Sequence, residues 1–230
     1  MELIITYYFE IICRKDKRMK YRLTAVVIGY LFGMIQTGYI YGKIQGVDIR
    51  KQGSGNTGAT NSLRTFGLKG GLITFLGDLL KTVLAIIFVE LLFGNDFGED
   101  VRLLRLYVGM GAILGHNFPF YLNFKGGKGI ACSLGLVFMV YPMAAPLCLG
   151  VFFLTVILSK YVSLGSILAV IMVAVQVILF NANGILHLNA NAVIEVNVLT
   201  VLLSCLAIFQ HRANIGRLIK GTENKIGKKK

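Results

Sequence analysis

Seven blocks of mostly apolar residues constrain the fold of this chain more than any other feature. A helix needs about 20 apolar residues to cross the hydrocarbon core of a bilayer, because each residue adds about 1.5 Å. The blocks predict an all-α integral membrane protein, a bundle of about seven transmembrane helices, some short, with Gly-rich polar loops on the cytoplasmic face. The expected spans are Leu23–Ile44, Leu72–Phe93, Leu103–Phe118, Ile130–Tyr141, Met143–Leu158, Leu164–Phe180 and Ala192–Phe209. The third to fifth are short and cross only if flanking residues snorkel or the bilayer thins, so five spans is the alternative.

Composition favours the same class of protein. Of 230 residues, 55 % are hydrophobic and 15 % charged, whereas a soluble domain has about a quarter charged residues. A soluble protein with an unusually large core is disfavoured, because the excess of apolar residues falls into long blocks. A net charge of +13 could indicate a nucleic-acid partner, but Lys and Arg lie between the blocks and in the tail. We therefore expect membrane lipids, and no nucleic acid, as partners.

The distribution of cations predicts the orientation in the membrane. The connections on one side are rich in Lys and Arg, and the positive-inside rule places them in the cytoplasm together with the C-terminus. They include Lys43, Arg50, Lys51, Arg64, Lys69, Lys125, Lys128, Lys160, Arg212, Arg217 and Lys220. An odd number of spans then places the N-terminus outside, which conflicts with the six cations between Arg14 and Arg22.

Residues 1–18 are therefore interpreted separately from the rest. Either they are a mis-called extension before a natural start at Met19, which we favour, or Leu3–Cys13 is an interfacial segment that keeps its basic flank inside. Residues 19–224 are expected to form a single polytopic domain, and 225–230 a basic tail. Four cysteines without a CxxC pair and three histidines without metal-ligand spacing predict no disulfide framework, metal or cofactor.

Three polar clusters carry the chemistry, and all fall on the predicted cytoplasmic side. They read GSGNTGATNSLR (53–64), GHNFPFYLNFKGGKG (115–129) and HRANIGRLIKGTE (211–223). Gly-rich loops present backbone N–H groups, and a nearby cation adds charge, which is how proteins hold phosphate. Flexible cytoplasmic connectors are the alternative for one such loop, but three together indicate anion binding. Two Gly-rich loops with cations suggest two phosphates.

Several other phosphate and acyl chemistries do not fit these loops. Lys128 is followed by Gly129 and lacks the first glycine of a Walker A loop, and Ser54 lacks the GxSxG spacing of a nucleophile elbow.

Asp78 and Lys81 lie three residues apart on one helix face inside a span, where an ion pair is either functional or structural. There Asp78 would orient Lys81 or Arg64.

The three clusters, together with KYVSLGSI, resemble motifs of the bacterial acyl-phosphate:glycerol-3-phosphate acyltransferases (the PlsY family), in the same order. The resemblance runs from about Leu23 to Glu223; the N-terminal segment and Cys132–Ser133 depart from the family pattern. It implies a seven-helix enzyme of the bacterial cell membrane with a cytoplasmic active site. Such an enzyme transfers a fatty acyl group from acyl phosphate to the 1-hydroxyl of glycerol 3-phosphate. The products are lysophosphatidic acid and phosphate, in the first committed step of phospholipid synthesis.

Carried onto this sequence, the resemblance implies roles for individual residues. Ser54, Arg64 and Lys128 would act on phosphate, and His211 and Asn214 would bind glycerol phosphate and orient its hydroxyl; Asp78 and Lys81 would support the site. Further substrate-binding residues would be Gly53, Gly55, Asn56, Asn61, His116, Lys125, Gly126, Gly127 and Gly129, with Gly126 and Gly127 supplying N–H donors. Transfer would be direct, without an acyl-enzyme, and an enzyme that supplies acyl phosphate would be a partner.

A membrane carrier or channel for an anionic phosphorylated solute is the alternative function. A transporter places polar residues near the bilayer midplane, often in broken helices. Here the spans are apolar apart from Asp78, Lys81 and Gln176, and the polar groups crowd one face. That arrangement favours an enzyme with one soluble and one lipid substrate.

Overall fold

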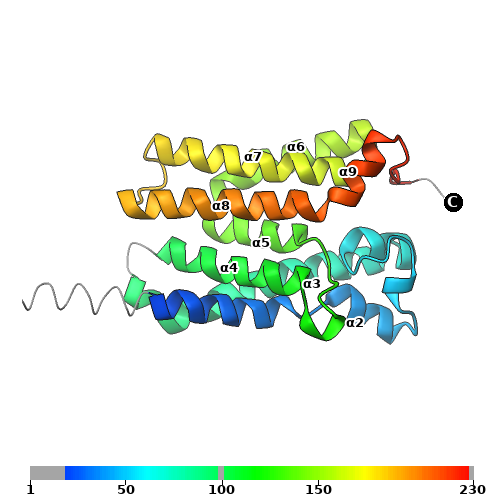
Figure 1. Cartoon of the computed structure of the whole chain (residues 1–230), viewed down its shortest axis with the longest axis horizontal. Helices are drawn as coiled ribbons and strands as arrows, with labels where there is room; N and C mark the ends of the chain where they lie inside the picture. The colour runs from blue at the N-terminus through cyan, green and yellow to red at the C-terminus, as the bar shows by residue number, and fades with distance from the viewer. Residues whose placement is uncertain (1–18, 98–100, 228–230) are drawn as a thin grey trace, which may run out of the picture.

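The structure, a computed structural model, describes residues 19–97 and 101–227, and all regular elements in these two ranges are helical (Figure 1). The prediction of an all-α chain is therefore confirmed, while residues 1–18 and the end of the basic tail lie outside the described part. A helix at residues 19–33 is followed by α2 (Thr37–Ile44), α3 (Ala59–Phe97), α4 (Val101–Asn117), α5 (Ile130–Val140), α6 (Ala145–Ser159), α7 (Val162–Ala182), α8 (Ala190–Gln210) and α9 (Arg212–Ile219). Short 3₁₀ turns η1 (Ile49–Lys51), η3 (Phe120–Leu122) and η4 (Pro142–Ala144) join some of them.

Each of the seven predicted spans is helical, but they differ in length. Five segments of the described chain are long and apolar enough to cross a membrane: Met19–Ile44, Ala59–Phe97, Pro142–Ser159, Val162–Ala182 and Ala192–Gln210. Large apolar side chains on them are exposed, including Leu91, Leu154 and Leu158, as expected where helices face lipid. The chain is thus a multi-pass membrane protein, and α4 and α5 are the two predicted spans below that length.

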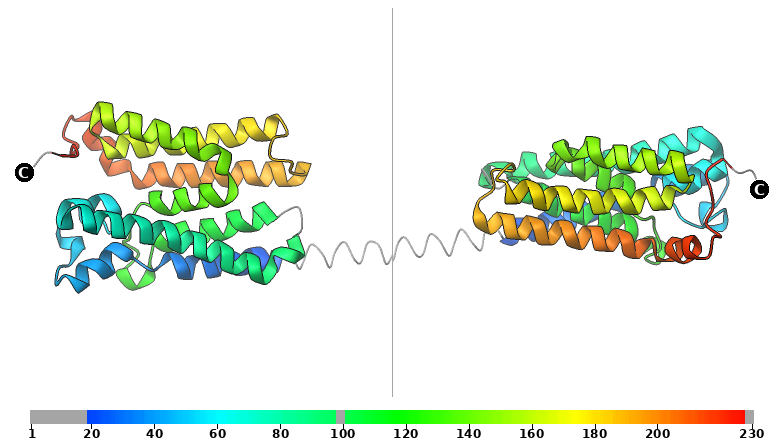
Figure 2. Two further views of the ribbon diagram at one scale, coloured as in Figure 1. Left: turned by 180° about the vertical axis from the view of Figure 1, so that it is seen from behind. Right: turned by 90° about the horizontal axis from the view of Figure 1, so that it is seen from above.

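The helices form two groups that lie side by side along the bundle (Figures 1 and 2). In the first group, α3 packs against α2, α4 and α5; in the second, α7 packs against α6 and α8. The core between them is apolar and centres on buried residues such as Ile86, Leu104, Val108 and Val196. Because α4 meets α8 and α5 meets α6, the two groups share one core.

Helices α5 and α6 form a hairpin that turns inside the bundle, short of the end that α7 and α8 reach (Figure 2). With 11 and 15 residues, they extend only about 16 and 22 Å, less than the roughly 30 Å hydrocarbon core. Irregular backbone at such a depth needs polar partners. Buried Gln176 of α7 supplies one, because its Nε2 donates to the carbonyl of Ala144 at 3.3 Å.

The first predicted span, Leu23–Ile44, is not one continuous helix, because it breaks at residues 34–36. Buried Gln36 stabilises the break: its Nε2 donates to the His116 carbonyl at 2.9 Å, and its Oε1 accepts from the Thr57 hydroxyl at 2.7 Å. The second predicted span also differs, since α3 starts at Ala59 rather than Leu72 and kinks at Gly67, where φ is +71°. Both irregularities lie toward the polar end of the bundle.

The first helix and α4 cross with their backbones in contact. Gly29 and Gly33 on one helix face Gly111 and Gly115 on the other, and an added Cβ at any of them would overlap a backbone carbonyl oxygen of the partner helix. Small residues four positions apart allow such close approach in membranes, where van der Waals packing stabilises helix pairs. The crossing holds α4, and the loop that follows it, against the first span.

Substituting one of these glycines tests the crossing. Gly111→Ala should lower the free energy of unfolding by about 1–3 kcal/mol, because the helices must separate to admit the methyl group. Thermal unfolding in detergent would show a lower midpoint. Gly150→Ala on α6 is the matched control, since nothing lies within 4 Å of its added Cβ. Equal midpoints for the two variants would contradict the close crossing.

Candidate active site

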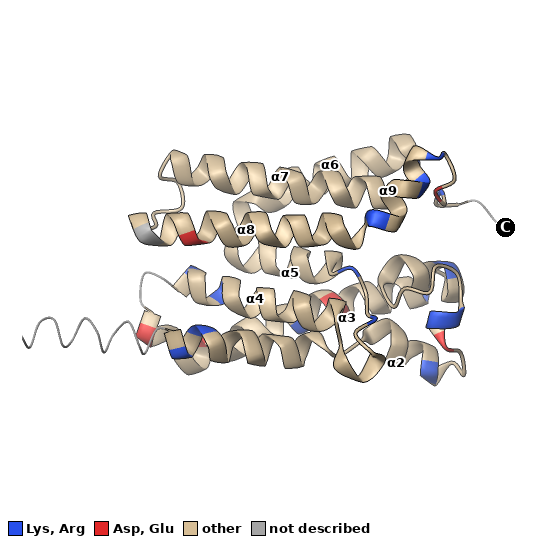
Figure 3. Ribbon diagram, viewed as in Figure 1, with Lys and Arg blue, Asp and Glu red and all other residues tan. Residues whose placement is uncertain are grey.

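A cavity of about 860 Å³ opens at the end of the bundle where the described chain ends. Figure 3 shows that Lys and Arg gather at this end. All three polar clusters line the cavity, among them Ser54, Arg64, Lys128, His211 and Asn214. The sequence therefore predicted correctly that the clusters share one face; the structure brings them to one cavity.

The first loop is shaped by Asn61, which lies in the first turn of α3. Its Oδ1 accepts the N–H of Ser54 at 2.9 Å, and its Nδ2 donates to the carbonyls of Gln52 and Asn56 at 3.0 and 2.9 Å. Gly53 and Gly55 have φ of +54° and +72°, a region that favours glycine. Asn61 lines the cavity but is buried, and its amide is used to hold the first loop in this shape.

The second loop corrects one expectation. The N–H groups of Gly126 and Gly127 do not point to the cavity as phosphate donors, because they donate to the carbonyls of Asn117 and His116 at 3.1 and 3.0 Å. These glycines are needed for space, since a Cβ on Gly127 would overlap the His116 ring. The loop ends at Gly129, which begins α5 with φ +78° and lines the cavity with Ile130 and Ala131. The first N–H groups of a helix have no partner within it, so the N-terminus of α5 offers the anion donors of this loop.

The third cluster is organised by Glu223, which sequence reasoning did not assign to the site. Its Oε1 accepts from Asn214 at 2.6 Å and from Ser163 at 3.0 Å, and its Oε2 accepts from Arg217 at 2.7 Å. Burial raises the pKa of Glu223, but the hydrogen bonds from Asn214, Arg217 and Ser163 outweigh it and hold the pKa below its ordinary value. Ser163, Arg217 and Glu223 all stand in the motifs quoted above, and their place in those motifs was the available signal.

Hydrogen bonds also join the three clusters to one another. Asn56 donates to the Gly126 carbonyl at 3.3 Å, which joins the first loop to the second. Arg64 donates to the Asn224 carbonyl at 3.4 Å, and Lys128 donates to Oδ1 of Asn214. Of the remaining predicted residues, Ser54 and Lys125 are exposed on the cavity lining. The site is therefore one connected polar structure built from segments up to 160 residues apart.

Beneath the second loop lies a buried ionic cluster of Asp78, Lys81 and His116. Lys81 Nζ lies 2.9 Å from Asp78 Oδ1, 2.9 Å from His116 Nδ1 and 2.6 Å from the carbonyl of Ile35. An ammonium group that donates to Nδ1 leaves the ring proton on Nε2, on the side of Gly127. Asp78 thus pairs with Lys81, one of the two expected partners, and the cluster supports the second loop through the His116 ring.

Two groups at the cavity have shifted pKa values. Burial, followed by the positive charges of Arg217 and Arg64, lowers the pKa of Lys128 to about 8, although Glu223 opposes the shift. Burial and the charge of Lys128 lower the pKa of His211 to about 4. His211 is therefore neutral near pH 7, and its Nδ1 donates to the Ala207 carbonyl at 2.8 Å. Its Nε2 then carries no proton and can accept a hydrogen bond.

Fold and site together define a polytopic membrane protein with a basic, anion-binding cavity at one end of its helix bundle. Comparison with known proteins identifies the family. The family model for glycerol-3-phosphate acyltransferase matches residues 23–221, and the chain belongs to this family. The relative from Clostridioides difficile (strain 630), a glycerol-3-phosphate acyltransferase, is 44 % identical over 89 % of this chain and 95 % of its own length. One from Thermoanaerobacter sp. (strain X514), of the same name, is 40 % identical over 91 % and 98 %.

Two solved structures share the fold. The crystal structure of PlsY (YgiH), an integral membrane glycerol 3-phosphate acyltransferase, in its glycerol 3-phosphate form matches with a TM-score of 0.76 at 36 % identity, covering 90 % of this chain and 96 % of that chain. Its lysophosphatidic acid form matches with a TM-score of 0.74 at 35 % identity, covering 90 % and 95 %. The prediction of membership in the PlsY family is thus confirmed.

The lowered pKa of Lys128 predicts how anion affinity depends on pH. Lys128 attracts phosphate only when it is protonated, so the affinity for glycerol 3-phosphate should fall as pH rises through about 8. The ligand's own charge is constant there, because the second pKa of a phosphate monoester is about 6. Lys128→Arg keeps its charge and should remove the fall. Calorimetric titrations at pH 7 and 9 would check both proteins, and a wild-type affinity equal at the two pH values would contradict this role of Lys128.

Proposed function

We propose that the protein transfers a fatty acyl group from acyl phosphate to the 1-hydroxyl of glycerol 3-phosphate, forming lysophosphatidic acid and phosphate. The observation that carries this proposal is the convergence of three basic clusters on one cavity of about 860 Å³, which accommodates two phosphorylated groups. Family membership supports an acyltransferase. The glycerol 3-phosphate and lysophosphatidic acid forms of the related structure support this acceptor and this product.

The donor is inferred from what the site offers chemically. A less reactive donor such as a coenzyme A thioester calls for a base that activates the hydroxyl, and a His-x₄-Asp pair would supply that base with its orienting carboxylate. In this chain the residues five beyond His116, His187 and His211 are Tyr121, Ala192 and Gly216. A mixed anhydride needs less activation, because phosphate is a good leaving group, and it brings a second phosphate for the second cation to bind. Acyl phosphate therefore fits both the missing base and the two cationic centres.

The reaction is proposed to proceed by direct transfer. The 1-hydroxyl oxygen attacks the acyl carbonyl carbon, the bond from that carbon to the phosphate oxygen breaks, and inorganic phosphate leaves. Arg64, Lys128 and the N–H groups at the start of α5 stabilise the charge that develops on the carbonyl and phosphate oxygens. Neutral His211 and Asn214 orient the hydroxyl. His211, with a pKa of about 4, is a poor proton acceptor. The proton of the attacking hydroxyl therefore goes to the departing phosphate.

Charge distribution supports a cytoplasmic location for this chemistry. At the site end the cations far outnumber Asp and Glu, whereas cations and acids are mixed at the other end (Figure 3). There Arg22 is paired with Glu195 at 2.8 Å and Arg105 with Glu90. Pairing with Glu195 compensates the charge of Arg22, one of the six N-terminal cations noted above. We therefore assign the site and the C-terminus to the cytoplasmic side of the bacterial cell membrane.

Turnover of single variants tests the proposed roles. Arg64→Ala and Lys128→Ala should each lower kcat by about 10²–10³-fold, the usual cost of losing one preorganised donor. Arg64→Lys should recover only part, because a point charge lacks the bidentate fork. Lys69→Ala is the matched control, since Lys69 is exposed on the same helix and outside the cavity lining. Equal activity of Arg64→Ala and Lys69→Ala would refute the role of Arg64.

Initial-rate kinetics separate direct transfer from an acyl-enzyme. With both substrates varied, the reciprocal plots should intersect, as for a ternary complex. Ser54→Ala should keep measurable turnover, because Ser54 would only donate a hydrogen bond. Parallel lines, a burst of product and complete loss of activity in Ser54→Ala would instead show a covalent intermediate on Ser54.

Cysteine labelling tests the orientation. In a variant without Cys13, Cys132, Cys148 and Cys205, a single cysteine at position 54 should resist an impermeant reagent added to intact cells. A single cysteine at exposed Asn183, which follows α7 at the other end, should react. The reverse pattern would invert the proposed topology.

A further inference from the structure

The break between the first helix and α2 is held in place by other parts of the chain (Figure 1). The Ile35 carbonyl accepts from Lys81 on α3 at 2.6 Å, and the Met34 carbonyl accepts from Tyr121 in the η3 turn at 2.7 Å. The side chain of Gln36 is buried and points away from solvent toward both the first and the second loop of the site. The break is therefore fixed in position, and Gln36 is the residue that connects it to the site.

The amide of Gln36 has one orientation that satisfies its neighbours. Its Nε2 lies 2.9 Å from the His116 carbonyl oxygen and 3.5 Å from the Gly33 carbonyl oxygen, and both oxygens can only accept. The amide oxygen therefore faces the Thr57 hydroxyl, which donates to it at 2.7 Å. Because Thr57 is also buried, water does not compete for this hydrogen bond.

These hydrogen bonds join the first loop to the second. Thr57 belongs to the first loop. On the other side of Gln36, the His116 carbonyl also accepts the N–H of Gly127, the residue before Lys128, at 3.0 Å. A single buried side chain thus connects the first loop with the turn that carries Lys128.

A second link between the two loops lies nearer to solvent. Asn56 donates to the Gly126 carbonyl at 3.3 Å, and Asn56 is half-buried and lines the cavity. A hydrogen bond shielded from water is electrostatically stronger than one in contact with it. The shorter, buried bonds of Gln36 therefore fix the spacing of the loops more firmly than the Asn56 bond does.

Helix α2 does not account for the side chain of Gln36. Gln36 is the N-cap residue of α2, yet its side chain makes no capping hydrogen bond. Ser, Thr, Asp and Asn are the residues that cap a helix start well. Gln36 also lies outside the residues that line the polar cavity. Its amide therefore acts on the two loops, and not on helix α2 or on a ligand.

We propose that Gln36 is a positioning residue, which aligns the first and second loops so that Arg64 and Lys128 act on one acyl phosphate. Arg64 lies in the α3 helix that follows the first loop, and Lys128 lies in the second loop. A misplacement of about 1 Å between reacting groups can lower a rate about 10²-fold. This inference rests on the proposed function, since it assumes a transfer in which both cations stabilise one transition state.

Turnover per binding site tests the inference. Gln36→Met keeps the length of the side chain and loses both hydrogen bonds, whereas Thr57→Val loses the hydroxyl that donates to Gln36. Each should lower kcat, at saturation with both substrates, by about 10–100-fold. The kcat is divided by the number of glycerol 3-phosphate sites found by calorimetric titration, so that unfolded protein does not count.

Two further variants are the controls. Thr57→Ser keeps the hydroxyl and should retain the wild-type kcat. Gln45→Met makes the same chemical change at an exposed position that follows α2, and it should leave kcat unchanged. If Gln36→Met does not fold, the comparison of Thr57→Val with Thr57→Ser decides the question in the same way.

The outcomes separate this inference from the proposed function. A wild type that does not transfer the acyl group from acyl phosphate would overturn both. A wild type that does, with equal kcat per site in Gln36→Met and Gln45→Met, would overturn the positioning role alone. Fewer sites and a lower unfolding midpoint in Gln36→Met, with unchanged kcat per site, would show that Gln36 only stabilises the fold.

Discussion

The contacts of one buried ammonium group hold together the polar end of this protein. Lys81 and Asp78 are 4 % and 2 % exposed, within a helix that is long and apolar enough to cross a membrane. A buried charge persists only when it is paired and hydrogen-bonded, and Lys81 meets this need by binding three segments at once. It contacts Asp78 on α3, the Ile35 carbonyl at the break in the first span, and His116 at the end of α4. Removing one partner would leave a charge without compensation in the bundle.

The same cluster explains how the loops are divided between structure and ligand binding. His116 supports Gly127, and the N–H groups of Gly126 and Gly127 are used within the protein. Asn61 supports the first loop in the same way, through hydrogen bonds with the N–H of Ser54 and the carbonyl of Asn56. We propose that the side chains of Arg64 and Lys128 and the first N–H groups of α5 remain to bind anions. Internal hydrogen bonds therefore hold both loops in place, and donors that are preorganised in this way stabilise transition-state charge most effectively.

The sequence predicted the helical segments and the meeting of the three clusters, because hydropathy and glycine-rich motifs are local signals. It did not predict the break at residues 34–36, which depends on Gln36 bonding to His116 and Thr57, 80 and 21 residues away. The roles of Gly126 and Gly127 were misjudged for a related reason. A glycine that provides N–H donors and a glycine that makes room for a neighbouring ring look alike in sequence, and only the position of His116 distinguishes them. Glu223 was missed because its role depends partly on Ser163, which lies 60 residues away in the sequence and meets Glu223 only in the folded chain.

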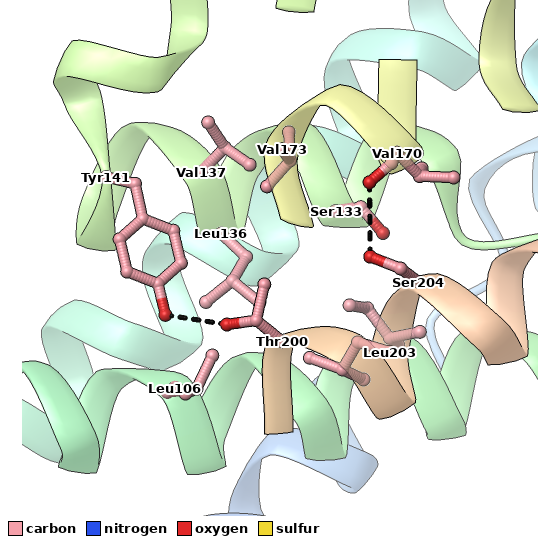
Figure 4. A pocket seen from close by; sticks show the side chains of 11 residues that line it. Leu106, Ser133, Leu136, Val137, Tyr141, Val170, Val173, Thr200, Leu203 and Ser204 are labelled. Atoms are coloured by element: carbon pink, nitrogen blue, oxygen red, sulfur yellow. Dashed lines mark hydrogen bonds between the residues drawn. The ribbon is translucent and has the colours of Figure 1, made fainter. Parts of the chain in front are cut away.

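The short α5 runs from the polar cavity into the core of the bundle. Its N-terminus faces the polar cavity, and its C-terminus ends at Tyr141, inside the bundle. A turn at that depth is tolerated only where its backbone groups find partners, and Gln176 provides one for Ala144. Because α5 ends inside the bundle, Tyr141 is buried there and its hydroxyl bonds to that of Thr200 on α8 at 3.0 Å (Figure 4), so the turn that shortens α5 also ties the two groups of helices together.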